Sequence, residues 1–301
     1  MLTTRLTIGL SMVGGFLAIL ALDEWYEPWY PLWFATSMVV MGHSALEVVG
    51  MLQGTSARPS GNTVFGGVLA IVIANWTPHV LTYLTQSPQM AAEPAYDASL
   101  PVHVLAWPLW TFVAVVMFAF IGQSAQFDRP GHTMATIAGT VLAVAYVGIL
   151  GSFIIQFRWL PHGAVPLAAL VAAAKGADTG AYTFGRLAGR HKLWPRLSPN
   201  KTVEGALGGM VFGLLAVLII FAVARYGLHV PTLTWPAAIG FGLIVSATAQ
   251  LGDLMESMIK RDCAVKDAST AVPGFGGVLD VMDSLLFAGP VAYGYWLAFG
   301  P

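Results

Sequence analysis

The sequence predicts an all-α, polytopic integral membrane protein. Three observations support this fold class: 56% of the 301 residues are hydrophobic, only 10% are charged, and the mean hydropathy is +0.71. Ordinary soluble domains carry about 25% charged residues. A chain this poor in charge is typical of proteins that live in a bilayer, and no soluble domain fits between its apolar segments.

Apolar runs long enough to cross a bilayer as helices recur along the whole chain. A spanning helix needs about 20 residues, within a range of about 17 to 25. Nine runs fit, near residues 6–22, 29–52, 63–84, 102–122, 133–155, 163–184, 205–224, 233–252 and 284–300. The first run ends in Asp23-Glu24 without a small-residue cleavage motif, so we expect a span and not a cleaved signal peptide.

The distribution of Lys and Arg predicts the orientation. With the N-terminus in the cytoplasm, inner segments hold eleven of the 14 basic residues, and outer segments hold only Arg158 and Arg225. Lys175 lies within a span. Because basic residues concentrate on the cytoplasmic side, we expect a cytoplasmic N-terminus, and we expect the two long polar segments, 185–204 and 253–283, to be cytoplasmic loops.

The segment from Gly252 to Asp283 is a polar island between two apolar runs. It holds six Asp or Glu residues besides its basic ones. Ionisable groups at a membrane boundary are costly, so such a set indicates a functional site. The alternative is a juxtamembrane loop whose charges face water.

Spacing within this island predicts its local structure. Asp253, Glu256, Ser257 and Lys260 fall at i, i+3, i+4 and i+7 and therefore share one helical face. The Pro and Gly residues of 273–277 predict a flexible loop that can approach a phosphate closely. A new helix is expected near Leu279, with Asp280 and Asp283 on one face of its first turn. The single cysteine, Cys263, excludes an intrachain disulfide. A reactive thiol is the alternative to the preferred interpretation, an incidental small residue.

A second group of polar residues begins inside the sixth apolar run. Lys175, Asp178, Tyr182 and Arg186 follow at helical spacing. Because about twelve residues, or about 18 Å of helix, precede Lys175, these charges are expected to enter the membrane from its cytoplasmic side. A water-filled cavity would accommodate them. A Lys175–Asp178 pair that only locks helices together is the alternative.

The basic segment that follows carries Arg186, Arg190, Lys192, Arg196 and Lys201. Such a cluster suits a polyphosphate or anionic lipid headgroups, although positive-inside topology alone also explains it.

Two features of the apolar runs complete the picture. Glu47 lies within the second run, with His43 one turn earlier, and a buried carboxylate there is either functional or a structural hydrogen-bonded pair. Gly205, Gly209 and Gly213 recur every four residues, a pattern that predicts close helix packing.

Three motifs together resemble the phosphatidate cytidylyltransferase (CDP-diacylglycerol synthase) family. The first reads Asp178-Thr179-Gly180-Ala181-Tyr182 with Gly185-Arg186. The second reads Ser198-Pro199-Asn200-Lys201-Thr202-x-Glu204-Gly205 with Gly208-Gly209. The third reads Ser257-x-x-Lys260-Arg261, Lys266-Asp267-x-Ser269, Pro273-Gly274-x-Gly276-Gly277 and Asp280-x-x-Asp283. Phe275 stands where the family usually has His, and Val281 where it usually has Arg. The N-terminal half contributes only hydropathy to the match.

The resemblance implies that CTP and phosphatidate give CDP-diacylglycerol and diphosphate at a site facing the cytoplasm, in the inner membrane of the cell. It implies a homodimer, contact with membrane lipid and no nucleic-acid partner. Residues 1–132 then form an N-terminal region of spans one to four, and 133–301 the catalytic region. The catalytic candidates are Asp253, Lys260, Arg261, Lys266, Asp267, Asp280 and Asp283. The candidates for binding CTP are Lys175, Asp178, Tyr182, Arg186, Ser198, Lys201, Thr202 and Glu204.

Two polyanions must meet in such a reaction, so the site needs cations. Mg²⁺ prefers one or two carboxylates together with substrate phosphates, and we expect one or two ions held by Asp253, Asp280 and Asp283. The attacking phosphate is already ionised, so no strong general base is required.

Other functions stay open at this stage. A relative that uses CTP on a different lipid phosphate or on a polyprenol is the nearest alternative. A transporter is a second, although the paired broken helices of two related halves are not evident. An inactive scaffold is the third.

Overall fold

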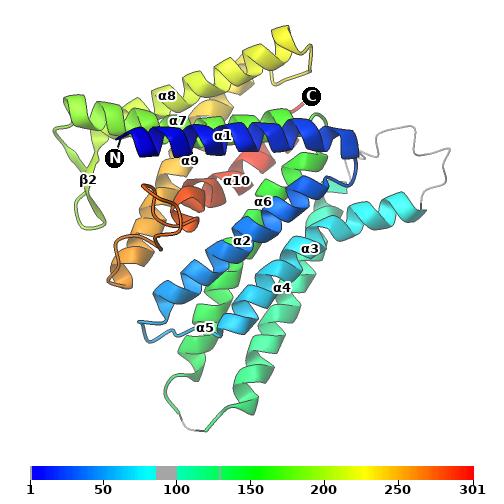
Figure 1. Ribbon diagram of the computed structural model, residues 1–301, viewed down its shortest axis with the longest axis vertical. Helices are drawn as coiled ribbons and strands as arrows, with labels where there is room; N and C mark the ends of the chain where they lie inside the picture. The colour runs from blue at the N-terminus through cyan, green and yellow to red at the C-terminus, as the bar shows by residue number, and fades with distance from the viewer. Residues whose placement is uncertain (1, 86–99, 129) are drawn as a thin grey trace. The chain divides into compact units, whose positions relative to one another are not determined.

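The computed structural model describes residues 2–85, 100–128 and 130–301 and is built almost entirely of helices (Figure 1). The helices are α1 (Leu2–Asp23), α2 (Pro31–Leu52), α3 (Gly61–Thr85), α4 (Leu100–Ala125), α5 (Thr133–Val144), α6 (Leu150–Gln156), α7 (Ala164–Ala188), α8 (Val203–Ala222), α9 (Trp235–Asp262) and α10 (Leu279–Phe299). Short 3-10 and π segments, η1 (Glu24–Tyr26), η2 (Ala145–Ile149), η3 (Phe157–Trp159) and η4 (Val223–Gly227), adjoin them.

Each of the nine predicted apolar runs coincides with helix, which confirms the all-α membrane class. The run at 133–155 is one continuous rod of α5, η2 and α6. Seven of the described helical segments are long and apolar enough to cross a membrane. The remaining two, α7 and α10, carry charged residues of the motifs. Arg129, one of the inner basic residues counted above, lies outside the described residues.

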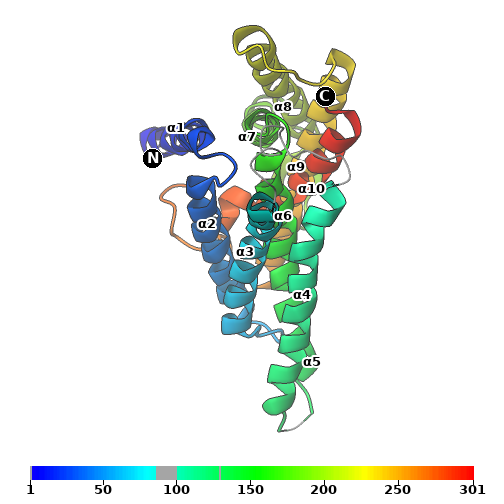
Figure 2. The same ribbon diagram turned by 90° about the vertical axis from the view of Figure 1, so that its right-hand side faces the viewer.

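Contacts divide the chain into two compact units, which are described separately. Unit 1 comprises Met1–Trp159 and Asp267–Leu279, and unit 2 comprises Leu160–Lys266 and Asp280–Pro301. Within unit 1, α2, α3 and α4 run side by side (Figure 2). Within unit 2, α7 packs along α8, and α9 packs on both. The functional division at residue 133 stays a prediction.

The contact between α7 and α8 is a seam of backbone against backbone. A Cβ atom on Gly209 would lie 2.8 Å from the carbonyl oxygen of Ala177, and one on Gly213 would lie 2.7 Å from that of Ala173. Real Cβ atoms do not approach an oxygen so closely, so only glycine allows this packing. The predicted close approach at the glycine repeat is confirmed.

The polar segment expected as a loop at 185–204 contains a β-hairpin. Strand β1 (Lys192–Trp194) pairs antiparallel with β2 (Ser198–Thr202), with Lys192 opposite Thr202. The Thr202 hydroxyl then accepts a hydrogen bond from the Gly205 N–H at 3.1 Å and caps the start of α8. The strands are short and β2 contains Pro and Asn, which are depleted in strands, so the sequence carried no β signal.

Candidate active site

Helices α9 and α10 meet in unit 2 at Gly252. A Cβ atom there would lie 2.7 Å from the carbonyl oxygen of Asp283 and 3.2 Å from the Cα of Ser284. This close crossing brings the next residue of α9, Asp253, near the Asp283 side chain, and the charges of Asp253, Lys175 and Asp178 act on the Asp283 carboxyl group. Polar residues of the first and third motifs are therefore neighbours.

Lys201 connects the second motif to the polar island of 252–283. Its Nζ lies 2.7 Å from Oδ2 of Asp253, so strand β2 is joined to α9 by an ion pair. Both side chains are partly exposed, at 26% and 32%. The Lys201 ammonium nitrogen itself is buried, so the exposed parts are the rest of the two side chains.

Lys260 lies between two carboxylates. Its Nζ donates to Oδ1 of Asp280 at 2.6 Å and also pairs with Oε2 of Glu256, one turn earlier on α9. Glu256 is fully buried, and the Lys260 side chain is only 12% exposed. Buried charges are tolerated when they are paired, so this triad fixes the start of α10 against the end of α9.

Lys175 of α7 also reaches α10. Its Nζ lies 3.2 Å from Oδ2 of Asp178, 3.0 Å from the Val281 carbonyl oxygen and 3.3 Å from the Ser284 hydroxyl. The ion pair considered from the sequence is present. It is not an isolated lock, because the same ammonium group binds the helix that carries Asp280 and Asp283.

Other predicted CTP-binding residues organise the segment between α7 and α8. The Glu204 carboxylate accepts from the backbone N–H groups of Arg190, at 3.0 Å, and His191, at 3.2 Å, and lies 2.6 Å from Nδ1 of His191. Arg186 donates to the Tyr182 hydroxyl at 3.1 Å, on an exposed face. Ser198 opens β2 and is partly buried.

Three predicted catalytic residues lie at the surface. Arg261, Lys266 and Asp267 are exposed. Arg261 donates to the Val265 carbonyl oxygen at 3.4 Å. The two cations among them are accessible to an incoming phosphate group, whereas Lys260 is held by acids.

The carboxylates fit a hard divalent cation in their chemistry. In the described part of the chain, no three His, Cys, Asp or Glu side chains are gathered in a ready metal cluster. Asp253 and Asp280 are instead each neutralised by a lysine. Among the described residues, no hydrogen-bond partner reaches the buried Oε1 of Glu256. An all-oxygen, acidic donor set with an unsatisfied buried acceptor suits Mg²⁺ better than a softer metal.

Glu256 was placed on the shared helical face from the sequence but was not assigned to the site. The structure makes it the most buried acid of the group. Its spacing of four residues from Lys260 was the available signal, because Glu followed by Lys at i+4 favours pairing on a helix. Burial itself could not be read from the spacing.

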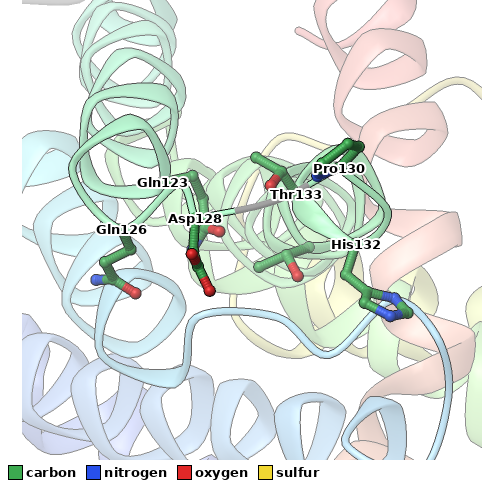
Figure 3. Close-up of a pocket in the computed structure, with 7 residues that line it drawn as sticks. Gln123, Gln126, Asp128, Pro130, His132 and Thr133 are labelled. Carbon is green, nitrogen blue, oxygen red and sulfur yellow. The ribbon is translucent and has the colours of Figure 1, made fainter.

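Unit 1 contains a separate polar hollow of about 390 Å³ at the connection between α4 and α5 (Figure 3). Gln123, Gln126 and Asp128 line it from the α4 side, and His132 lines it at the start of α5. None of its lining residues belongs to the three motifs.

Lysines and acids converge from three segments of this helical membrane protein, an arrangement that suits a membrane enzyme acting on phosphate-bearing substrates. More specifically, the chain belongs to the cytidylyltransferase family, whose model matches residues 3–299. The family predicted from the three motifs is therefore confirmed.

Curated relatives agree with this assignment. The phosphatidate cytidylyltransferase of Staphylococcus aureus (strain COL) is 32% identical over 232 residues, which cover 76% of this chain and 86% of that protein. The phosphatidate cytidylyltransferases of Staphylococcus saprophyticus and Staphylococcus haemolyticus are 41% and 39% identical over 151 residues, half of this chain and 55% of each relative.

Proposed function

We propose that this protein is a phosphatidate cytidylyltransferase, which transfers the cytidylyl group of CTP to phosphatidate and releases diphosphate. The family and the names of its relatives support this function. The observation that carries it is the Lys201–Asp253 pair. It joins the segment that the resemblance assigns to CTP binding to the segment that it assigns to catalysis.

In this reaction an oxygen of the lipid phosphate attacks the α-phosphorus of CTP. The bond from that phosphorus to the β-phosphate oxygen breaks, and diphosphate leaves with the electron pair. The attacking oxygen is already ionised, so no residue has to remove a proton. The chain's task is to hold two polyanions together and to stabilise the charge that shifts to the leaving group.

Exposed cations suit the first part of that task. Arg261 and Lys266 would hold phosphate oxygens, because both are accessible and Arg in particular forms paired hydrogen bonds to phosphate. Lys175, Asp178, Lys201 and residues of the hairpin would bind CTP. Asp253, Asp280 and Asp283 would hold one or two Mg²⁺ ions, and bound Mg²⁺ supplies positive charge to the phosphates.

The membrane arrangement belongs to the same proposal. Nine helices would cross the inner membrane with the N-terminus in the cytoplasm, so that CTP reaches the site from the cytoplasm and phosphatidate from the bilayer. The protein would act as a homodimer. Attaching a membrane-impermeant label to single cysteines placed in 185–204 in intact and opened cells tests this orientation.

The decisive experiment supplies purified protein in mixed micelles with labelled CTP, MgCl₂ and a panel of lipid phosphates. We expect label in CDP-diacylglycerol when phosphatidate is present, and no label with an Asp253→Asn variant of the same folded yield. If label enters only the product of another lipid phosphate or of a polyprenol, that compound, and not phosphatidate, is the substrate. Phe275 and Val281, which depart from the family's usual His and Arg, make that panel necessary.

A further inference from the structure

Glu47 of α2 is a buried carboxylate whose hydrogen bonds go to one loop of unit 1. It is 6% exposed. Its Oε1 accepts from the Ser269 hydroxyl at 2.6 Å and from the Val278 N–H at 3.0 Å, and its Oε2 accepts from the Leu279 N–H at 2.7 Å. Nε2 of His43 lies 3.3 Å away. Both carboxylate oxygens are therefore used to hold the segment between Ser269 and Leu279.

The loop is shaped to receive this side chain. A Cβ atom on Gly277 would lie 2.6 to 2.7 Å from the carboxylate atoms of Glu47, so glycine is needed for their contact. Gly274 and Gly276 have φ of +85° and +106°, a backbone conformation that glycine adopts without strain. Both features belong to the glycine-rich part of the third motif.

The two backbone donors lie where a helix begins. Leu279 is the first residue of α10, and the first N–H groups of a helix have no partner within it. The preceding residue, Val278, cannot cap these groups with its side chain. Glu47 caps them from 232 positions away in the sequence, and its negative charge suits the positive end of the helix dipole.

We propose that Glu47 is a positioning residue for cytidylyl transfer, which fixes the glycine-rich loop and the first turn of α10. Its two oxygens accept three hydrogen bonds from this segment, which is the pattern of a structural acceptor. Asp280 follows Leu279 directly in the chain, and Asp283 lies one turn later, so the orientation of that turn sets the direction of both carboxylates. The catalytic part of this inference rests on the proposed function.

The test compares Glu47→Gln with a matched control, Ser44→Ala. Ser44 is also buried in α2, but its hydroxyl has no hydrogen-bond partner among the described residues. A glutamine keeps one acceptor oxygen and turns an NH₂ group toward a backbone N–H. We expect the amides of 269–283 in the full-length protein in micelles to exchange with deuterium about tenfold faster in Glu47→Gln. Ser44→Ala should exchange at the wild-type rate.

The second measurement is steady-state kinetics on the same preparations. We expect Glu47→Gln to lower kcat about tenfold or more, to raise the Mg²⁺ concentration for half-maximal activity, and to change KM for CTP by less than about twofold. A loss of folded protein alone would lower the total activity without moving the half-maximal Mg²⁺ concentration. If Glu47→Gln does not fold, Ser269→Ala removes one donor and should give the same pattern at smaller size.

Unchanged exchange of 269–283, or kcat and Mg²⁺ dependence equal to those of Ser44→Ala, would overturn the inference. If wild-type protein makes no CDP-diacylglycerol, the proposed function fails, and the exchange experiment still decides whether Glu47 holds the loop.

Discussion

The ammonium group of Lys201 lies 2.7 Å from the carboxylate of Asp253. The first residue belongs to a hairpin strand within the second motif, and the second belongs to the C-terminal part of α9, just before the third motif. Both side chains are partly exposed, although the Lys201 nitrogen is buried, so we expect the pair to contribute modestly to stability, about 1 kcal/mol. Its value to the protein is therefore expected to lie in the arrangement of the site.

Replacing Lys201 with Met should separate these two contributions. We expect a modest stability loss, about 1 kcal/mol, because both side chains are partly exposed although the Lys201 nitrogen is buried. We expect kcat/KM for CTP to fall about 10²-fold, because a cation beside the substrate phosphates is lost. Thermal unfolding in detergent and cytidylyltransferase kinetics measure the two quantities. The control is Lys192→Met in the facing strand, and a Lys201→Met enzyme as active as this control would remove Lys201 from the CTP site.

For the buried triad of Lys260, Glu256 and Asp280, we expect a large effect on stability. Lys260→Met removes the cation that pairs with Glu256 and Asp280, and breaking a buried pair in this way costs about 3 to 5 kcal/mol. The variant should therefore unfold at a much lower temperature. Adding Glu256→Gln removes one of the two uncompensated charges and should recover part of that stability. Recovery of stability without recovery of activity is the expected result, and equal unfolding temperatures for all three proteins would contradict the buried triad.

Local signals in the sequence predicted the helices and their limits well. The glycines of 273–277 cannot continue a helix, and α10 begins at Leu279 as expected. The glycine repeat from Gly205 to Gly213 correctly predicted close helix packing, because glycines at this spacing let the backbones of two membrane helices approach each other.

Partners far apart in the chain could not be predicted. Nothing near Glu47 in the sequence indicates that its oxygens bind Val278 and Leu279. Val278, which precedes α10, has no side-chain acceptor for the first N–H groups of the helix. This indicated only that an acceptor had to come from another part of the chain. Similarly, the spacing of Glu256 and Lys260 predicts a shared face, but only the packing of α9 on α10 buries it.

The glycine seam between α7 and α8 gives a prediction about folding. A Cβ on Gly213 would lie 2.7 Å from the Ala173 carbonyl oxygen and would also meet Ser246 of α9. We expect Gly213→Val to lower the yield of folded protein severely, because neither the α7 backbone nor the packed α9 can move away from the added side chain. The control is Gly66→Ala in α3, where no atom lies within 4 Å of the added carbon. This control should be neutral or stabilise by up to about 1 kcal/mol, because Ala favours helices over Gly. Size-exclusion profiles in detergent compare the two.

Cys263 gives a pH-dependent prediction. It lies just beyond the end of α9, where partial burial and the negative charge of Asp262 raise the pKa of its thiol above the ordinary value. A raised pKa means that the reactive thiolate is scarcer at neutral pH than in a free cysteine, and that it accumulates only as the pH rises through the higher value. Maleimide labelling of the folded protein should therefore be slower than labelling of free cysteine at pH 7, with the difference narrowing in strongly alkaline buffer. Cys263→Ser should keep wild-type activity, because no step of the reaction uses a thiol. Labelling at pH 7 as fast as that of free cysteine would show that the pKa of the Cys263 thiol is not raised and would contradict this prediction.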